Sequence, residues 1–316
     1  MFKRSKIYVA GHAGLLGSAL LRRLGSEGCG NVVTRARSVL DLTDQAQVDR
    51  FFREERPDYV FMAAGLTGGI MANKTRPAEF LHANISMQDN VFEACRRYEV
   101  KRAVFYGSSC IYPKGCPQPM KEEYLLAGPL EETSEPYAIA KIAGITACKA
   151  YNREDGVERF VALVPNSVYG PNDDFSLEGS HVLSALIRKI TDAKEEGRDR
   201  VALWGSGSPL REFLFSDDAA DASVFAILNA RGRGHYNVGS GMEMSIRDLA
   251  KCIAGVVGYK GEITWDRSRP DGAKRKLLDS SRFATLGWRP KVTLDEGIAA
   301  TCEWYSKNNS GGALCR

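Results

Sequence analysis

The 316-residue sequence is marked first by what it lacks. It contains no apolar run long enough to cross a lipid bilayer, which argues against a membrane-spanning protein. Its 43 basic and 39 acidic residues are mixed along the chain with no concentrated basic patch, so we expect no nucleic-acid partner. A strand pattern begins within a few residues of Met1, which leaves no space for a signal peptide, and we therefore expect a cytoplasmic protein.

Cysteine is present, but not in a ligand-like arrangement. The eight cysteines are scattered, with no CxxC pair and no cluster with histidine, so we expect no metal site. We expect reduced and mostly buried thiols, as is usual in a cytoplasmic protein. The formal charge of +4 suits a polyanionic small ligand such as a nucleotide diphosphate.

The first half of the chain alternates short apolar runs with helical patterns. Near-continuous apolar strands that alternate with helices predict an α/β fold with a Rossmann-type, doubly wound parallel sheet. The expected strands are residues 6–10, 31–34, 59–64, 103–107 and 160–164. The expected helices between them are residues 15–24, 43–56, 84–97 and 137–151.

The pattern becomes irregular after Asn166, with Gly and Pro clusters and no repeat. We expect residues 1–166 to form the dinucleotide-binding domain and residues 167–316 to form mostly a smaller C-terminal, substrate-binding domain. The chain is expected to return to the first domain around residues 212–230. Helices are expected at 182–195, 217–228, 245–257 and 294–304.

A glycine-rich loop directly follows the first expected strand and opens the first helix. Gly11 allows a tight turn, Gly14 lets backbone amides approach a pyrophosphate, and Gly17 lets helix and strand pack closely. The helix N-terminus adds partial positive charge. The loop, which also contains His12, Ala13, Leu15 and Leu16, therefore predicts dinucleotide binding.

The end of the second strand distinguishes NAD from NADP. An acidic side chain there would hold the ribose 2′-hydroxyl of NAD, but this chain carries Arg35 and Arg37. Arginine can pair with a 2′-phosphate, so we expect NADP(H) as the cofactor.

Two further segments suggest a catalytic group. Tyr137 and Lys141 form a YxxxK pattern, which places both side chains one turn apart on one helix face. A nearby ammonium favours the phenolate, so we expect Lys141 to lower the pKa of Tyr137. Ser108 and Ser109 follow the fourth strand, at the sheet edge where ligands bind, and a hydroxyl there can hydrogen-bond a reacting carbonyl.

The segments GHAGLLG, SSCIYPK, EPYAIAKIAG, SHV, WGSG, REF and RKLLD resemble the GDP-L-fucose synthase family of extended short-chain dehydrogenases/reductases. The resemblance implies 3,5-epimerisation of GDP-4-keto-6-deoxy-D-mannose, then NADPH-dependent reduction of its C4 ketone to give GDP-L-fucose. It also implies a homodimer, formed through the helices near Asn84 and Tyr137.

The same resemblance implies residue roles. It selects Ser108 over Ser109 as the triad hydroxyl, and it assigns Cys110 and His181 as the base and acid of epimerisation. It places Asp41 at the adenine edge. Further cofactor contacts implied are Ala63, Ala64, Tyr106, Gly107, Ser108, Ser109, Tyr137, Lys141, Pro165, Asn166, Ser167, Val168 and His181. Substrate contacts implied are Lys189, Trp204, Arg211, Asp271 and Lys276.

The chain departs from the family pattern at several of these positions. Ala13 replaces an arginine in the phosphate loop, and Lys189 replaces another arginine. Asn166-Ser167 and the run 172–174 also differ from the family segments. One alternative is therefore a related epimerase or 4-reductase that acts on another GDP-deoxysugar or heptose. A second is a non-catalytic dinucleotide-binding protein, which would need no Tyr–Lys pair.

Sugar-nucleotide dehydratases form another related class. They carry an Asp-Glu pair where this chain has Ser109 and Cys110, so dehydration chemistry is disfavoured.

Overall fold

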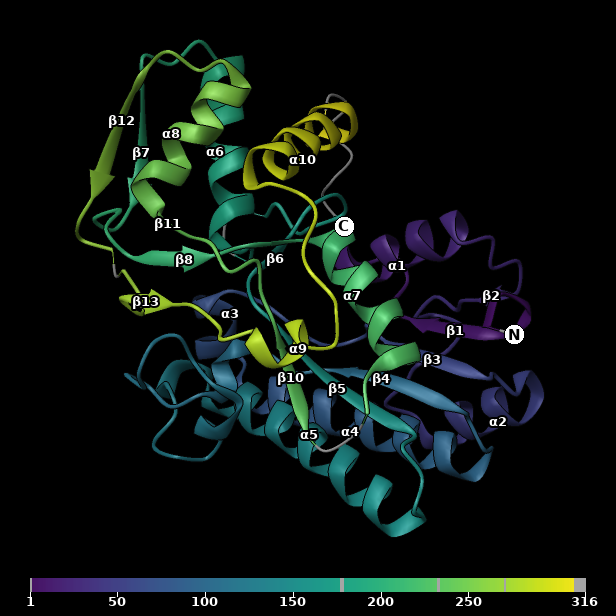
Figure 1. Ribbon diagram of the computed structural model, residues 1–316. Helices are drawn as coiled ribbons and strands as arrows, with labels where there is room; N and C mark the ends of the chain where they lie inside the picture. Colours follow the sequence, from purple (N-terminus) through teal and green to yellow (C-terminus); the bar gives the residue numbers. More distant parts are fainter. Residues whose placement is uncertain (1, 177–178, 232–233, 270, 310–316) are drawn as a thin grey trace.

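The computed structural model describes residues 2–176, 179–231, 234–269 and 271–309 (Figure 1). Its largest element is a six-stranded parallel sheet. In spatial order the strands are β10 (His235–Val238), β5 (Phe160–Pro165), β4 (Arg102–Tyr106), β3 (Tyr59–Met62), β1 (Ile7–Ala10) and β2 (Val32–Val33). The strand order reverses at β1, which has β2 on one side and β3 on the other. The predicted Rossmann-type doubly wound sheet is confirmed.

Helices cover both faces of this sheet (Figure 1). One face packs on α2 (Gln45–Glu55), α4 (Pro77–Arg97) and α5 (Glu135–Asp155), and the other packs on α1 (Leu15–Ser26) and α7 (Ser216–Asn229). The short α3 (Ile70–Thr75) leads into α4. The short 3₁₀ helices are η1 (Phe2–Arg4), η2 (Ser109–Ile111), η3 (Glu122–Tyr124) and η4 (Glu132–Ser134).

Local chemistry explains where these helices begin. The Asp44 carboxylate caps α2 by accepting a hydrogen bond from the amide of Gln47 at 3.0 Å. Pro77 and Pro136 lie in the first turns of α4 and α5, where a missing N–H group costs no helical hydrogen bond.

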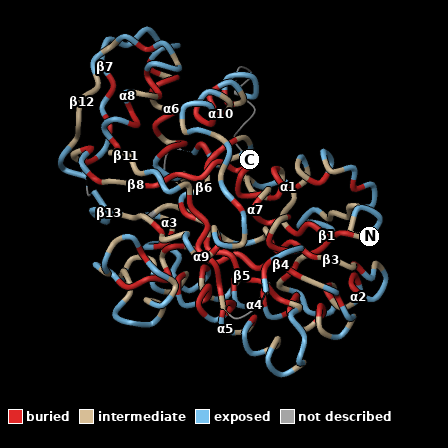
Figure 2. Tube along the Cα trace, in the orientation of Figure 1, coloured by how far each residue is buried: buried red, intermediate tan, exposed pale blue. Residues whose placement is uncertain are grey.

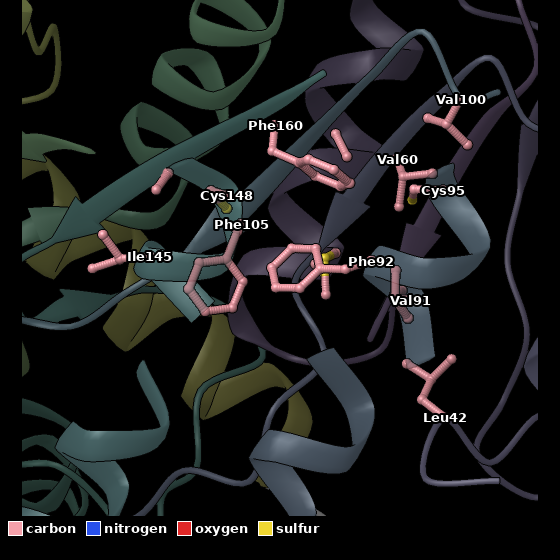
Figure 3. Close-up of a cluster of buried hydrophobic side chains, with 14 of the residues drawn as sticks. Leu42, Val60, Val91, Phe92, Cys95, Val100, Phe105, Ile145, Cys148 and Phe160 are labelled. Atoms are coloured by element: carbon pink, nitrogen blue, oxygen red, sulfur yellow. The ribbon is translucent and has the colours of Figure 1, made fainter. Parts of the chain in front are cut away.

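The core between the sheet and α4 is built from large apolar side chains that alternate along the strands. Phe105 and Phe160 extend from the sheet toward Phe92 of α4, as Figure 3 shows. The rings of Phe92 and Phe160 meet edge to face with centroids 5.0 Å apart. All three side chains are at most 2% exposed. Because helices cover both faces of the sheet, β4 and β5 are buried along almost their whole length, as near-continuous apolar strands predict.

A second group of elements packs around its own core, with Leu183, Ile187, Leu249 and Ile298 among its members. Its helices are α6 (Val182–Glu195), α8 (Ile246–Val257) and α10 (Leu294–Asn309). Its strands are β7 (Arg200–Trp204) paired with β12 (Glu262–Asp266), and β8 (Leu210–Glu212) between β11 (Glu243–Ser245) and β13 (Arg275–Lys276). Two short strands, β6 (Val168–Tyr169) and β9 (Leu214–Phe215), pair with each other.

The two groups are interleaved along the chain. After β9 the chain returns to the large sheet as α7, and β10 becomes the outer strand beside β5. The short α9 (Ser281–Ala284) follows, and Phe283 and Trp288 join the same core as α7. Figure 2 shows buried chain running through both groups. The large sheet is therefore completed by residues from the second half of the sequence.

Two features are absent from the described ranges. None of their helices combines the length and apolar character needed to cross a membrane. In the same ranges no three His, Cys, Asp or Glu side chains gather in a way that could hold a metal ion.

A buried polar network joins the loop after β4 to the outer strand β10. The hydroxyl of Tyr112 lies 2.9 Å from Nε2 of His235 and donates to Oδ1 of Asn237 at 2.5 Å. Asn237 in turn donates to the carbonyl of Met120 at 2.9 Å. His235 is 2% exposed, and burial, with the nearby charges of Lys149 and Arg282, lowers its pKa to about 4.

This buried histidine predicts acid-sensitive stability. His235 stays neutral in the folded protein down to about pH 4, whereas the unfolded chain binds a proton near pH 6.5. The free energy of unfolding should therefore fall as pH drops from about 6.5 to about 4, by about 3 kcal/mol from this residue. When the free energy of unfolding is measured by urea denaturation across this range, it should fall less steeply with decreasing pH in His235→Gln than in the wild-type protein. His82→Gln, at an exposed histidine, is the control. An equal pH dependence of the free energy of unfolding in the two variants would show that His235 is not its source.

Candidate active site

Two glycines of the phosphate loop are required by the packing of the chain itself. Gly11 has a φ of +75°, and a Cβ there would lie 2.6 Å from the amide nitrogen of Ala64 and 2.8 Å from the carbonyl carbon of Ala63. A Cβ on Gly17 would overlap the carbonyl oxygen of Gly11. These glycines allow β1, β3 and α1 to approach closely where the strand order reverses.

Gly14 differs from these two because nothing in the protein requires it to be glycine. Its φ is −81°, and the nearest atom to an added Cβ would be the Gly11 oxygen at 3.6 Å. It is the N-cap of α1 but provides no side-chain cap, and both it and Ala13 are exposed. The first amides of α1 are therefore open to a ligand, and this open helix N-terminus fits a pyrophosphate.

The two arginines after β2 have different surroundings. Arg35 is paired with Glu55 at 2.5 Å, donates to the Thr34 carbonyl at 2.8 Å, and lies over the ring of Phe51. Arg37 is exposed, and its charge faces Asp41. Arg37 is thus the arginine better placed for an incoming 2′-phosphate.

Asp41 is held by local hydrogen bonds at the start of the segment that leads into α2. Its Oδ1 accepts from the Thr43 amide at 2.9 Å and from the Thr43 hydroxyl at 2.8 Å, which holds the pKa of Asp41 below its usual range.

A small cavity, with room for about one water molecule, lies between the carboxyl ends of β1 and β3 and α5. Its lining combines apolar residues with three polar side chains, Asn84, Gln88 and Lys141. Asn84 fixes the loop after β3 by bonding both the amide and the carbonyl of Leu66, at 3.1 and 3.0 Å. Ala64, beside the phosphate loop, and Lys141 therefore line the same small cavity.

Tyr137 and Lys141 lie together on α5, as their spacing predicts. The Lys141 nitrogen is 5.7 Å from the centre of the Tyr137 ring and 5.0 Å from that of Phe105. Lys141 is 6% exposed, and burial lowers its pKa to about 8. Both side chains belong to one desolvated group.

The expected lowering of the Tyr137 pKa is wrong in this structure. Burial raises the pKa of Tyr137, as does the nearby Cys110, and only the hydrogen bond with Ser108 opposes them. Desolvation is the largest cause, because a phenolate is poorly stabilised away from water. Tyr137 is therefore neutral at pH 7 and able to donate a proton.

Ser108 and Ser109 have different environments. Ser108 precedes η2, and its hydroxyl lies near Tyr137 and Cys110, where it opposes the rise in the pKa of both. Ser109 is 8% exposed within the turn. Gly107 brings β4 close to β5, since a Cβ there would lie 3.0 Å from a methyl group of Val164.

Cys110 lies at the centre of this polar group. Burial raises the pKa of its thiol, whereas the Ser108 hydrogen bond and the charges of Lys276 and Lys141 lower it. Lys276 comes from β13, so the group contains residues from both halves of the chain.

The other residues expected to bind substrate include Arg211, Asp271 and Trp204. Arg211 pairs with Lys276 in the register of β8 and β13, and its charge faces Asp271. Asp271 accepts from the amide and hydroxyl of Ser206, at 2.6 and 2.8 Å. The ring of Trp204 is 47% exposed.

Trp204 is flanked by two cations. Lys189 lies 4.4 Å and Arg269 lies 4.9 Å from the ring centre. Sequence reasoning missed Arg269, although it stands two residues before Asp271.

His181 occupies a different place from Cys110. It is the exposed N-cap of α6, and its charge faces the half-buried Asp173. A hydrogen bond of 2.9 Å from the Gly69 amide to the Gly179 carbonyl brings this segment to the loop after β3. No hydrogen bond joins His181 to the Cys110 group within the described ranges.

Two expected cofactor residues direct their side chains into the interior. Tyr106 packs in the core that contains α7 and is 7% exposed. Asn166 is fully buried and donates to Glu212 at 2.8 Å and to the Lys276 carbonyl at 3.3 Å. Only their backbones can face a cofactor. The neighbouring Pro165 ends β5, Ser167 has a φ of +36°, and Val168 begins β6.

Glu212 is a structural residue that sequence reasoning missed. It is fully buried and accepts from Asn166, from the Gly241 amide at 2.7 Å and from the Leu278 amide at 3.0 Å. The sequence could have indicated this role, because Glu212 is an acidic residue directly before the apolar run 213–215.

Known proteins resemble this chain in sequence and in overall fold. The chain is 51% identical to GDP-L-fucose synthase 1 of Arabidopsis thaliana, over 97% of this chain and 94% of the relative. A GDP-mannoheptose C4 reductase from Campylobacter jejuni, solved with NADP bound, is 38% identical with a TM-score of 0.89, covering 97% and 99% of the two chains. A GDP-L-fucose synthetase from Naegleria fowleri bound to NADP is 27% identical with a TM-score of 0.90, covering 97% and 95%.

Residues 7–239 match the model of the NAD dependent epimerase/dehydratase family. This match runs from β1 to just beyond β10 and so includes every strand of the large sheet. The chain belongs to the NAD dependent epimerase/dehydratase family.

Proposed function

We propose that this protein epimerises GDP-4-keto-6-deoxy-D-mannose at C3 and C5 and then reduces the C4 ketone with NADPH, giving GDP-L-fucose. The observation that carries the proposal is the meeting of Cys110 with Ser108, Tyr137 and Lys141 beside the cations of β8 and β13. The identity to GDP-L-fucose synthase 1 over nearly the full length of both chains supports it.

The residues present fit NADP(H). The open N-terminus of α1 would hold the pyrophosphate, Arg37 the 2′-phosphate and Lys141 the nicotinamide ribose. When bound, NADPH supplies a hydride to C4 of the sugar.

The epimerase half needs groups that move protons at carbons beside a ketone. Protons at C3 and C5 are acidified because the C4 carbonyl can accept charge as an enolate. Cys110, as thiolate, takes the proton from one face, and His181 delivers a proton to the other. Ser108 hydrogen-bonds the oxygen on which charge develops.

The reductase half uses Tyr137 as the acid. Because its pKa is raised, Tyr137 holds its proton at pH 7 and donates it to the C4 oxygen. The adjacent Lys141 ammonium then stabilises the phenolate that remains.

The second candidate is a C4 reductase of another GDP-sugar, favoured by the likeness to the mannoheptose enzyme. Such an enzyme needs Tyr137 and Lys141 but no base beside the ketone. Cys110 within the group favours the epimerase/reductase.

We further propose a homodimer that uses α4 and α5. These helices pack side by side on one face of the sheet and leave Ile85 and Ile139 partly exposed. We also propose a cytoplasmic protein, since the seven described cysteines are all free thiols, as a reducing compartment would keep them.

The first prediction concerns the cofactor. Arg37→Ala should raise the KM for NADPH roughly tenfold or more, because a charge-assisted contact to the 2′-phosphate is lost. Arg35→Ala should have a smaller effect, since Arg35 is engaged with Glu55. Steady-state kinetics with NADPH and NADH measure both. A preference of the wild-type protein for NADH would contradict the proposal. So would an unchanged preference for NADPH in the variant that carries both Arg35→Ala and Arg37→Ala.

The second concerns reduction. Tyr137→Phe should lower the rate of NADPH oxidation by about 10²–10⁴-fold, because the proton donor to the C4 oxygen is removed. NADPH binding should persist, since Lys141 and the ring remain. Fluorescence titration with NADPH provides the control, and near-normal turnover would show that Tyr137 is not the acid.

The third separates the two halves of the reaction. Cys110→Ser should abolish deuterium uptake from D₂O at C3 and C5, because an alkoxide forms far less readily than a thiolate near pH 7. Residual NADPH consumption should give an unepimerised 6-deoxy sugar. Deuterium exchange at the wild-type rate in this variant would exclude Cys110 as the base.

The matched variant is His181→Asn. It keeps the base, so exchange with retained configuration should persist while inversion fails. Loss of exchange in His181→Asn together with normal exchange in Cys110→Ser would reverse the two assignments.

A further inference from the structure

Gln88 is a buried polar residue of α4 at the place where α4 packs against α5. The residue is 6% exposed, and its Nε2 donates a hydrogen bond to the Ala140 carbonyl of α5 at 2.9 Å. This bond fixes the orientation of the amide, because the reversed orientation would place two oxygens against each other. Oε1 of Gln88 is also buried and has no hydrogen-bond partner among the described residues. Buried amide oxygens are almost always hydrogen-bonded, either to protein or to an ordered water.

The Lys141 ammonium lies against the same aromatic ring as this oxygen. The Lys141 nitrogen is 5.0 Å from the centre of the Phe105 ring, whose place in the core is visible in Figure 3. A Cβ added to Gly144 would lie 2.8 Å from Oε1 of Gln88 and 2.6 Å from Cε1 of Phe105. The glycine therefore lets α5 approach closely enough for the ammonium and the amide oxygen to reach the ring of Phe105 together.

Asn84 of α4 also lies near the Lys141 ammonium. A Cβ added to Gly65 would lie 3.2 Å from Oδ1 of Asn84 and 3.6 Å from the Lys141 nitrogen, so the two groups border the same space. Oδ1 of Asn84 accepts from the Leu66 amide at 3.1 Å, and a carbonyl oxygen can accept a second hydrogen bond. Lys141 is 6% exposed, and within the described ranges its ammonium donates no hydrogen bond to the protein.

The small cavity beside α5 is lined by all three of these polar groups. Asn84, Gln88 and Lys141 supply its polar wall, and the other side chains that line it are apolar. The cavity has room for about one water molecule, and a buried water needs roughly two to four polar partners. The ammonium can donate to such a water, and the oxygens of Gln88 and Asn84 can accept its two protons. The cavity therefore offers both the space and the partners that an ordered water requires.

We infer that this cavity binds one water that bridges the Lys141 ammonium to Oε1 of Gln88, and that Gln88 is thereby a positioning residue for Lys141. The water site follows from the packing of α4 on α5, whereas its role in reduction rests on the proposed function. An ammonium has three donors. When the water holds one of them, the other two can be directed to the nicotinamide ribose and to the tyrosine oxygen.

The bridge also favours the charged form of Lys141. Burial lowers the pKa of this lysine to about 8, so the ammonium is lost readily as the pH rises. A water that accepts from the ammonium and donates to an amide oxygen stabilises the charge, which opposes the effect of burial. The titratable groups that face Lys141 are Tyr137 of the same helix and Cys110 of η2. Gln88 is neutral, so it supports the ammonium without adding a charge to α4.

A crystal structure of the wild-type protein tests the water directly. At high resolution, one water should lie about 2.7–3.2 Å from both the Lys141 nitrogen and Oε1 of Gln88. In Gln88→Met, whose side chain has a similar length but no amide oxygen, no water should bridge these positions. The absence of a water bonded to both groups in the wild-type protein would overturn the inference.

Titration of Lys141 measures the effect on the ammonium without substrate. The ¹³Cε NMR signal of Lys141, assigned by its loss in Lys141→Met, is followed from about pH 6 to about pH 11 in protein labelled with ¹³C-lysine. Gln88→Met should lower the titration midpoint by about one unit, because the acceptor behind the water is lost. An unchanged midpoint in Gln88→Met would overturn the inference.

Two further variants separate the acceptor from the packing of the helices. Gln88→Glu keeps an oxygen acceptor but loses the N–H group that bonds Ala140, so its midpoint should be at or above the wild-type value. An equal lowering in Gln88→Glu and Gln88→Met would assign the effect to the lost Ala140 bond and overturn the inference. Met87→Leu changes an apolar wall of the same cavity and should leave the midpoint unchanged. If Gln88→Met does not fold, as judged by circular dichroism, the wild-type crystal structure decides by its own criterion.

Kinetics then connects the water to reduction. The rate of NADPH oxidation with GDP-4-keto-6-deoxy-D-mannose should fall above the Lys141 midpoint, because the ammonium no longer stabilises the Tyr137 phenolate. In Gln88→Met this fall should move to lower pH by the same amount as the midpoint. A shifted midpoint with an unshifted rate profile would overturn the positioning role. Failure of the wild-type protein to form GDP-L-fucose would overturn the proposed function, whatever the crystal structure shows in the cavity.

Discussion

The site depends on the hydrogen bonds that the buried carboxylate of Glu212 accepts. It is fully buried, and burial raises its pKa, while the donors that bond it are the neutral groups of Asn166, Gly241 and Leu278. These donors come from the end of β5, the loop before β11 and the segment after β13. A charge placed in the interior is costly unless it is well bonded, so these three segments are held together around it. Arg211 and Lys276 are thereby positioned against the end of the large sheet.

Desolvation then determines the chemistry of the group around Cys110. Burial raises the pKa of Tyr137 and of Cys110 and lowers that of Lys141 and Lys276. Each group is pushed toward its neutral form, which suits an acid such as Tyr137 but opposes a thiolate base. At Cys110 this effect is opposed by the charges of Lys141 and of Lys276, which comes from the second half of the chain.

Much of this architecture follows from local sequence patterns. The strands after which Gly11 and Ser108 stand are short apolar runs bounded by turns, and their parallel pairing follows from the helices between them. The spacing of Tyr137 and Lys141 places them on one helix face whatever surrounds them. Resemblance to a family then supplied Cys110 and the substrate residues, which no periodicity singles out.

Other features depend on contacts between distant segments and could not be read locally. β10 completes the large sheet from the second half of the chain, and its pairing with β5 has no signature in either segment. The direction of the Tyr137 pKa shift depends on the total burial of the group rather than on the lysine one turn away. Arg35 is engaged by Glu55 twenty residues later, and Asn166 turns inward because Glu212 is there.

The proposed function requires one site to invert two carbons and then reduce the ketone between them. The most direct test is the product formed by the wild-type protein from GDP-4-keto-6-deoxy-D-mannose and NADPH in D₂O, identified by NMR. We predict GDP-L-fucose with deuterium at both C3 and C5 and protium, from NADPH, at C4. A GDP-6-deoxy-D-hexose with protium at C3 and C5 would contradict it and identify the protein as a reductase alone.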